Sequence, residues 1–373
     1  MRIAPPDRLH ARVKDVRASL AARHLDGVVV TSLANIAYLT GFFASAAALV
    51  LTRDEVILIG DSRYSESLAN RAHECPFIRP RQLPIGDSYE QGLVDALIPL
   101  RGATLGFEPD HLTVRRHRYL TRGLEKIGWE PPLVGCDGVV EHHRSQKDDW
   151  EIAVLRDAGA RLSNVAKCIL SNVLGGRTES EVAGQIDLEL RRAGFERAAF
   201  DTIVASGANA ALPHGRAGQR RIEPGDLVVL DFGGVLDGYC TDLSRTLIVG
   251  PAGSRERLVI EQVVDAQRAA FAAVRPGAAP ESVDEAARST LAGYGIADAF
   301  THGTGHGLGL EVHEAPRVSR VRAGQTEPPL GPGMTLTLEP GAYFPGWGGV
   351  RIEDDVLVTN DGAEWLTDAP RIL

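Results

Sequence analysis

The sequence predicts an α+β fold in which two related halves form one large domain, preceded by a smaller α/β domain. Two observations lead to this prediction. A pair of helical patterns followed by strand patterns occurs twice in the last two thirds of the chain, with a period of about a hundred residues. The first third instead alternates short helical and extended patterns. A length of 373 residues is enough for two domains with separate cores.

Composition restricts the classes of partner. The 40 Lys and Arg against 49 Asp and Glu give a net charge of −9, which disfavours nucleic acid. The short basic run 115–118 fits a solvated helix face. The longest apolar stretch, Phe42 to Leu51, is about half of a membrane span, and no apolar segment follows the N-terminal charges. Four cysteines without a C-x-x-C pair fit buried side chains in a reducing compartment. We expect a cytoplasmic protein without membrane or nucleic-acid partners.

The first domain is expected over residues 1–140. Apolar spacing predicts a helix over Arg8–His24, and strands are predicted at 27–31, 46–52 and 56–59, with a polar, partly helical segment after Asp61. The polar stretch 141–147 has the composition of a linker, so the second domain is expected over 148–373. His142 and His143 in this linker have no third ligand nearby in sequence and are expected to face solvent.

The second domain begins with a predicted amphipathic helix from Asp148 to about Val173. Thr178 and Glu181 then have the spacing of a capping box at the start of a second helix. A helix over 257–274 and a partner that begins within 276–283 repeat this arrangement. The repeat predicts a pseudo-twofold axis, with a functional site between the halves.

Carboxylates inside apolar strands give the strongest functional signal. Asp231 ends the apolar run 226–232, where an unpaired carboxylate would cost several kcal/mol and therefore needs a cation. The turn Asp237-Gly238 pairs Asp231 with Ser244 across a hairpin. Asp231 and Asp242 then become diagonal neighbours on one face, with Cα atoms roughly 7 to 8 Å apart.

A second hairpin repeats this design. Strands over 335–343 and 349–359 flank a turn centred on Gly346, which places Glu339 directly opposite Glu353 at a Cβ separation of about 5 Å. Alternation adds Tyr343 to the face of Glu339 and Arg351 to the face of Glu353.

Four converging carboxylates repel one another unless cations are bound. Two divalent cations would balance them, and His306, in the glycine-rich segment 301–314, is the natural fifth ligand. This oxygen-rich set suits manganese or cobalt better than a structural zinc, and paired metals activate water for hydrolysis. The segment is not a dinucleotide fingerprint, because Leu308 replaces the third glycine. It also lacks the second histidine of H-E-x-x-H, and Pro316 interrupts the helix that motif needs.

With these blocks in order, the chain resembles the creatinase, aminopeptidase P and prolidase family of dinuclear metallopeptidases. The match is strong over 148–373, and segment 200–214 resembles the family's first catalytic histidine block. Segments 38–42 and 61–64 are similar to the creatinase-type N-terminal domain. The resemblance implies the pita-bread fold for the second domain, a homodimer, and two divalent ions, with Mn²⁺ first and Co²⁺ or Zn²⁺ as alternatives.

The resemblance also implies individual roles. Asp242 and Glu353 would bridge the metals, Asp231 would chelate one and His306 the other, and Glu339 would bind metal and act as general base. His214 and His313 would orient the substrate and stabilise the oxyanion. His302, Tyr343 and Arg351 match positions near the pocket for the residue after the scissile bond. A structural role for His302, and a structural ion pair for Arg351, remain open alternatives.

The resulting hypothesis is an exopeptidase that cleaves the bond before proline in peptides with proline at the second position. The N-terminal domain favours the proline peptidases over methionine aminopeptidase. Xaa-Pro aminopeptidase is placed first and Xaa-Pro dipeptidase (prolidase) second. A creatinase-like metal-free amidinohydrolase or a non-catalytic binding protein is disfavoured, because those branches lose ligands that this sequence retains.

Overall fold

The computed structural model describes residues 1–172, 175–251, 253–320 and 327–371. The chain divides into two compact units between Arg144 and Ser145, inside the polar stretch 141–147. That stretch is not the irregular linker predicted, because Glu141–Ser145 forms a short helix, α6. The fully buried Arg144 explains the difference, since its guanidinium donates to Asn35 Oδ1 at 2.8 Å and so acts as an interior residue.

The first unit is a six-stranded mixed sheet with helices packed on it. The strand order is β4-β3-β2-β1-β5-β6, with β1 antiparallel to β2 and parallel to β5. Its strands are β1 Gly27–Val30, β2 Ala48–Thr52, β3 Val56–Gly60, β4 Ile78–Gln82, β5 Leu105–Phe107 and β6 Val134–Gly135. Its longer helices are α1 Pro6–Ala22, α2 Leu33–Thr40, α3 Ser65–Glu74, α4 Tyr89–Leu97 and α5 Val114–Lys126. The predicted first helix and the three predicted strands are therefore confirmed within two residues at each end, and the basic run 115–118 lies on α5.

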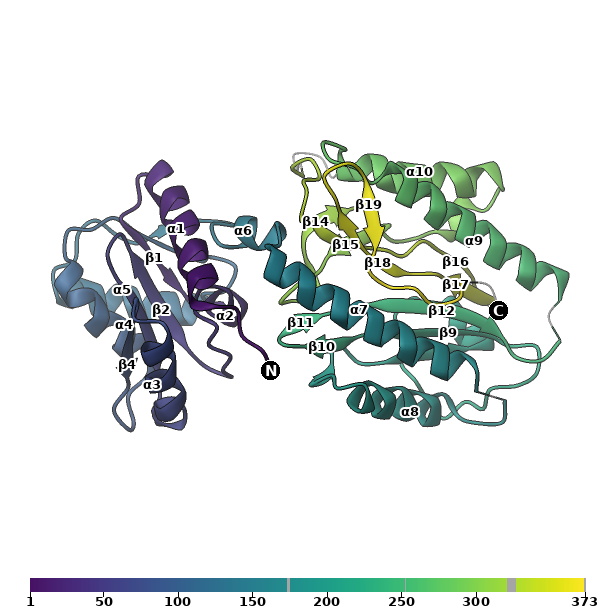
Figure 1. The fold of residues 1–373 in the computed structure, drawn as a ribbon, viewed down its shortest axis with the longest axis horizontal. Coiled ribbons are helices and arrows are strands. Elements are labelled where there is room, and N and C mark those ends of the chain that lie inside the picture. The colour runs from purple at the N-terminus through teal and green to yellow at the C-terminus, as the bar shows by residue number, and fades with distance from the viewer. Residues whose placement is uncertain (173–174, 252, 321–326, 372–373) are drawn as a thin grey trace. The chain divides into compact units, whose positions relative to one another are not determined.

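The second unit repeats two helices followed by strands. The first half contains α7 Asp149–Leu170, α8 Glu179–Arg192, β7 Arg197–Ala198, β8 Ile203–Ser206, β9 Leu227–Phe232, β10 Gly234–Leu236, β11 Tyr239–Cys240 and β12 Leu243–Ile248. The second half contains α9 Ser254–Ala273, α10 Pro280–Gly293, β13 Gly305–Gly307, β14 Glu314–Val318, β15 Thr335–Leu338, β16 Gly341–Phe344, β17 Gly348–Arg351, β18 Asp354–Val358 and β19 Ala363–Trp365. Within this unit, α8 lies on one side of the strands and α9 and α10 lie on the other (Figure 1).

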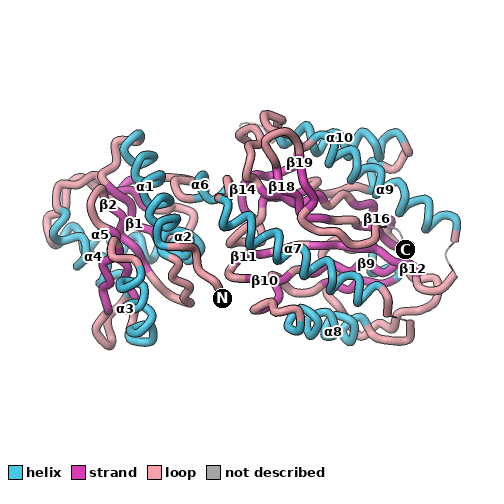
Figure 2. The backbone as a smooth tube through the Cα atoms, viewed as in Figure 1, coloured by secondary structure: helices cyan, strands magenta, loops and turns pink. Residues whose placement is uncertain are grey.

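Each half has its own hydrophobic core. Leu162 of α7 and Ile186 of α8 pack with Val228 of β9, whereas Val263 of α9 and Ala287 of α10 pack with strands of the second half. The strands of the two halves together lie between α8 and the pair of helices α9 and α10 (Figure 2). The α8 capping box is confirmed, because the Thr178 hydroxyl accepts from Glu181 N and the Glu181 carboxylate accepts from Thr178 N. Helix α7 ends at Leu170, and the predicted end at Val173 lies outside the described residues.

Both predicted hairpin registers are confirmed. Leu236 pairs with Tyr239, and Asp231 pairs with Ser244. In the second hairpin, the β16–β17 and β15–β18 pairs share one register about Gly346, such as Tyr343 with Gly349 and Leu338 with Asp354. The predicted continuous strands are nevertheless interrupted at Asp242, Glu339 and Glu353, each of which lies between two strands. The interruptions release these carboxylates from the regular pleat.

Two further findings concern the cysteines and the possibility of a membrane-spanning helix. Cys168 is exposed, so the expectation that all four cysteines are buried is wrong for this residue, which lies on the outer side of α7. Among the described residues, every helix is too short or too polar to cross a lipid bilayer.

Candidate metal centre

The second unit contains a cavity of about 890 Å³ that gathers the predicted site residues. Its walls include Asp231, Asp242, Glu339, Glu353, His306, His214, His302, His313 and Arg351. Tyr343 is buried behind this wall and contacts it through hydrogen bonds to His302 and Arg351. The hairpins of both halves therefore converge on one cavity.

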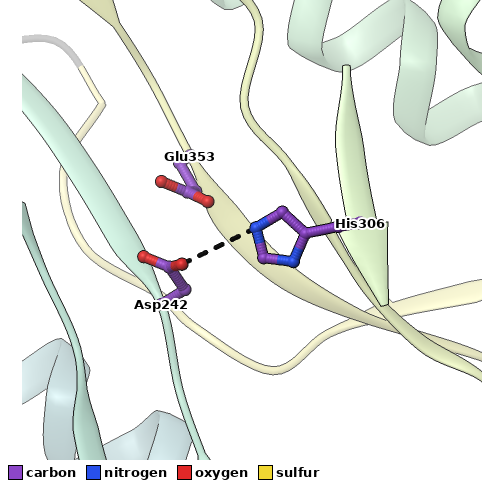
Figure 3. Close-up of side chains that lie close together, drawn as sticks. All are labelled: Asp242, His306 and Glu353. Carbon is purple, nitrogen blue, oxygen red and sulfur yellow. Dashed lines mark ion pairs between the residues drawn. The ribbon is translucent and has the colours of Figure 1, made fainter. Parts of the chain in front are cut away.

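Three of the predicted ligands form a compact cluster. Asp242, His306 and Glu353 each offer a ligand atom, and these atoms lie within 4.8 Å of one another. Their side chains point toward a common centre from the β11–β12 connection, from β13 and from the segment between β17 and β18 (Figure 3). Glu339 lies beside them, with its Oε1 3.6 Å from His306 Nε2.

The ring of His306 has the orientation of a metal ligand. Its Nδ1 lies 3.0 Å from the carbonyl oxygen of Gly307 and therefore carries the hydrogen. Burial, assisted by His313, lowers the pKa of His306 to about 4, so the ring is neutral at pH 7. The Nε2 lone pair then faces Asp242 Oδ2 at 3.8 Å. A lone pair facing carboxylate oxygens is unfavourable unless a cation lies between them.

The carboxylates are in an environment that opposes their charge. Burial and the neighbouring acidic groups raise the pKa values of Asp242 and Glu353 well above their usual range. Burial, opposed by Arg351 and assisted by Asp231, raises the pKa of Glu339 to about 8. The buried atoms Asp231 Oδ1 and Asp242 Oδ1 accept no hydrogen bond from the described residues. Unsatisfied oxygens beside an imidazole lone pair fit the donor set of a divalent cation.

Asp231, a further predicted ligand, lines the same cavity and forms an ion pair with an arginine. Its Oδ2 accepts from Arg351 Nη2 at 2.6 Å. Arg351 Nη1 donates to the Tyr343 hydroxyl at 2.9 Å, and the Tyr343 oxygen lies 2.9 Å from His302 Nε2. His302 Nδ1 donates to Gly303 O at 2.8 Å, so in the neutral ring Nε2 is the acceptor and the Tyr343 hydroxyl donates to it. Burial lowers the pKa of His302 to about 4, consistent with this neutral ring.

The two predicted substrate histidines lie at the open side of the cavity. His214 and His313 are exposed and line the cavity from opposite halves of the domain. The His313 ring lies 4.2 Å from the His306 ring, centroid to centroid. Both imidazoles are therefore accessible from the cavity.

Sequence reasoning missed the side chains that support the cluster. Ser244, which is fully buried, donates to Glu353 Oε2 at 2.7 Å and accepts from Arg351 Nε at 2.9 Å. Asp355 Oδ2 accepts from Asp242 N at 3.1 Å. Alternation from Asp242 would have placed Ser244 on the same face, whereas the contact between Asp355 and Asp242 joins the two halves and leaves no local signal.

The glycines of segment 301–314 allow close approach of the backbone, and two of them, Gly303 and Gly305, line the cavity. A Cβ on Gly305 would lie 1.9 Å from Thr337 O, and one on Gly307 would lie 2.1 Å from Ala315 O. These glycines allow β13 to approach its neighbouring strands closely, and this approach positions His306.

The fold and the cavity together define a hydrolase of the kind that binds divalent cations between two half-domains. Comparison with known proteins gives the family. Residues 153–360 match metallopeptidase family M24, and residues 12–146 match the creatinase/prolidase N-terminal domain. The chain belongs to metallopeptidase family M24. It is a metal-dependent peptidase, and the family resemblance inferred from its sequence is confirmed.

Relatives of known structure share both domains. The Xaa-Pro dipeptidase from Bacillus anthracis superimposes with a TM-score of 0.89 at 31% identity, covering 98% of this chain and 99% of that chain. The X-Pro aminopeptidase from Thermotoga maritima superimposes with a TM-score of 0.86 at 29% identity, covering 97% of this chain and 98% of that chain. The Xaa-Pro dipeptidase of Pyrococcus horikoshii is 31% identical over 98% of this chain and 99% of its own length. The predicted two-domain fold, with a pita-bread catalytic domain, is therefore confirmed.

Proposed function

We propose that this protein is an Xaa-Pro dipeptidase that uses two divalent metal ions, with Mn²⁺ as the first candidate and Co²⁺ or Zn²⁺ as alternatives. The observation that carries the proposal is the cluster of Asp242, His306 and Glu353, where a neutral imidazole lone pair faces buried carboxylates. Asp231 and Glu339 would complete the ligand set from the same cavity. Bound ions of this kind supply a water molecule that is a strong nucleophile at neutral pH.

The other side chains of the cavity would act as general base, stabilise the oxyanion and bind the proline ring. Glu339 would accept a proton from the attacking water and return it to the departing proline nitrogen. His214 and His313 donate to the carbonyl oxygen as negative charge develops on it. Arg351 and His302, with Tyr343 bonded behind them, would form the wall against which the proline ring packs.

A cationic side chain at the cavity favours the dipeptidase over the aminopeptidase. Arg317 lines the cavity and is the cross-strand partner of His306. A dipeptide carries a free carboxylate on its proline, one residue from the scissile bond, whereas a longer peptide has an uncharged amide there. An arginine that lines the cavity would distinguish the two substrates by this charge.

Substitution of Arg317 tests this distinction. Arg317→Ala should raise KM for Gly-Pro at least tenfold, because a charge-assisted hydrogen bond of about 1.5–3 kcal/mol is lost. KM for an X-Pro-Pro tripeptide should change less than threefold. Arg268→Ala, an exposed arginine on α9 away from the cavity, is the matched control. Equal effects on both substrates would exclude this role of Arg317.

Xaa-Pro aminopeptidase, placed first by the sequence analysis, is the second candidate and is less directly supported. The similarity to the Thermotoga maritima enzyme favours it. Hydrolysis of Gly-Pro and of an X-Pro-Pro tripeptide should be measured with and without Mn²⁺, with Asp242→Asn as the inactive control. Faster cleavage of the tripeptide would favour the aminopeptidase, and no cleavage of either by the metal-loaded protein would refute both. The homodimer and the cytoplasmic location remain predictions.

A further inference from the structure

A buried carboxylate outside the metal centre binds both ends of one loop at the cavity. Glu179, in the first turn of α8, has no solvent exposure. Its Oε1 accepts from the backbone N of Ser206 at 2.8 Å and from the Ser206 hydroxyl at 2.7 Å. Its Oε2 accepts from the backbone N of Gly218 at 3.1 Å, and Asn209 Nδ2 donates to Oε1 at 3.2 Å. A buried carboxylate needs such donors, and the N-terminal end of a helix favours its charge.

The loop closed by this carboxylate carries a predicted catalytic histidine. Residues 213–217, including His214, line the cavity between the two anchored ends at Ser206 and Gly218. The loop also contacts the buried chain of the site, because Pro213 O accepts from Arg351 Nη1 at 3.1 Å. His214 is itself exposed, so its position depends on the loop that carries it.

We propose that Glu179 is a positioning residue for the peptidase reaction, which fixes the 206–218 loop so that His214 faces the substrate carbonyl. The role assigned to His214 rests on the proposed function. Glu179 does not line the cavity and acts only through the loop.

The second half of the domain contains a similar arrangement, in which a buried helix carboxylate bonds to a segment at the cavity. Asp284 of α10, which is also buried, accepts from Thr304 N at 3.0 Å and from the Thr304 hydroxyl at 2.8 Å. Arg288 bonds to Asp284 and donates to the carbonyl oxygen of His302. In each half, a carboxylate of the second helix thus holds the segment that brings a histidine to the cavity.

Glu179→Gln is the direct test. The glutamine amide has only one oxygen, so it cannot accept hydrogen bonds from both ends of the loop. If its oxygen replaces Oε1, its NH₂ faces the Gly218 N–H, which loses its acceptor, and that end of the loop keeps only its bonds to Ser180. Glu181→Gln is the matched control. It removes the same charge from the same helical turn, but Glu181 bonds to Thr178 and not to the loop.

Two measurements on the full-length protein decide the proposal. Amide hydrogen exchange over 206–218 should be at least tenfold faster in Glu179→Gln than in wild type, with exchange in β9 and in the Glu181→Gln control unchanged. In a double-mutant cycle, Glu179→Gln should lower kcat/KM for the Xaa-Pro substrate about tenfold alone, and less than twofold in a His214→Ala background.

Equal exchange over 206–218 in the two glutamine variants would overturn the proposal, and so would multiplicative losses in the cycle. If wild type cleaves no Xaa-Pro peptide, the proposed function fails, whereas the exchange measurement still decides whether Glu179 holds the loop. If Glu179→Gln does not fold, Ser206→Ala and Asn209→Ala keep the carboxylate and remove one donor each. Each should then accelerate exchange over 206–218, and unchanged exchange in both would refute the anchor.

Discussion

Replacement of Ser244 by alanine tests whether the support behind the metal centre controls metal binding. The Ser244 hydroxyl donates to Glu353 and accepts from the charged Arg351, and all three residues are buried. Each hydrogen bond to a charged group contributes about 1.5–3 kcal/mol. Ser244→Ala leaves the Glu353 carboxylate with one donor fewer and free to rotate away from the cluster.

We expect Ser244→Ala to lower both the stability of the metal-free protein and its affinity for Mn²⁺. The free energy of unfolding of the metal-free protein should fall by about 2 kcal/mol. Loss of a hydrogen bond that orients a ligand typically weakens metal binding 10- to 100-fold, so we expect about thirtyfold weaker binding of Mn²⁺, equivalent to about 2 kcal/mol.

The assay is urea unfolding of the metal-free protein together with calorimetric titration of Mn²⁺. Ser163→Ala is a matched control, because this buried hydroxyl also donates one hydrogen bond, to Gly159 O, and accepts one, from Asp368 N, but lies on α7 away from the cavity. The control should lose stability and keep its metal affinity. Unchanged Mn²⁺ affinity in Ser244→Ala would refute the reasoning.

Three further predictions concern the same domain. Since the folded pKa of Glu339, about 8, lies above its unfolded value of about 4.3, its stabilising effect is complete below pH 4.3 and is lost as pH rises through 8. The Tm of the metal-free protein should therefore fall between pH 6 and 8.5, and saturating Mn²⁺ should reduce that fall in a calorimetric scan; a parallel fall with metal would contradict this. Arg245→Leu should cost about 3–5 kcal/mol in urea unfolding, because the buried guanidinium bonds to Asp354 at 2.7 Å and donates to four backbone carbonyl oxygens, all of which lose this donor; a loss below 1 kcal/mol would show these contacts to be dispensable. Gly305→Ala should lower both Tm and Mn²⁺ affinity, because its Cβ meets the backbone carbonyl of a neighbouring strand. The control Gly184→Ala, on a helix face with open space, should leave Mn²⁺ affinity unchanged. An unaffected affinity in Gly305→Ala would show that β13 tolerates the displacement.

Local sequence patterns were sufficient for the hairpins and their registers. The turn at Asp237-Gly238 and the spacing about Gly346 each fix the alignment of their strands, since pairing on both sides of a tight turn follows by counting residues. The pairing of Asp231 with Ser244 can therefore be predicted from one continuous segment of the chain.

Contacts between distant segments could not be predicted in this way. The interruptions that release Glu339 and Glu353 from the pleat have no signature in the alternation of apolar residues. The short helix at 141–145 was missed because Arg144, polar by composition, is buried against Asn35 from a segment far away in the chain.

The amino-acid sequence by itself determined which residues could carry the chemistry, because charge, alternation and turn type are local properties of the chain. Only the tertiary structure decided how they are held. Asp231 bonds to Arg351 across the two halves, and Glu179 closes the loop of His214. Such contacts depend on the packing of whole half-domains, which brings together side chains that no local pattern relates.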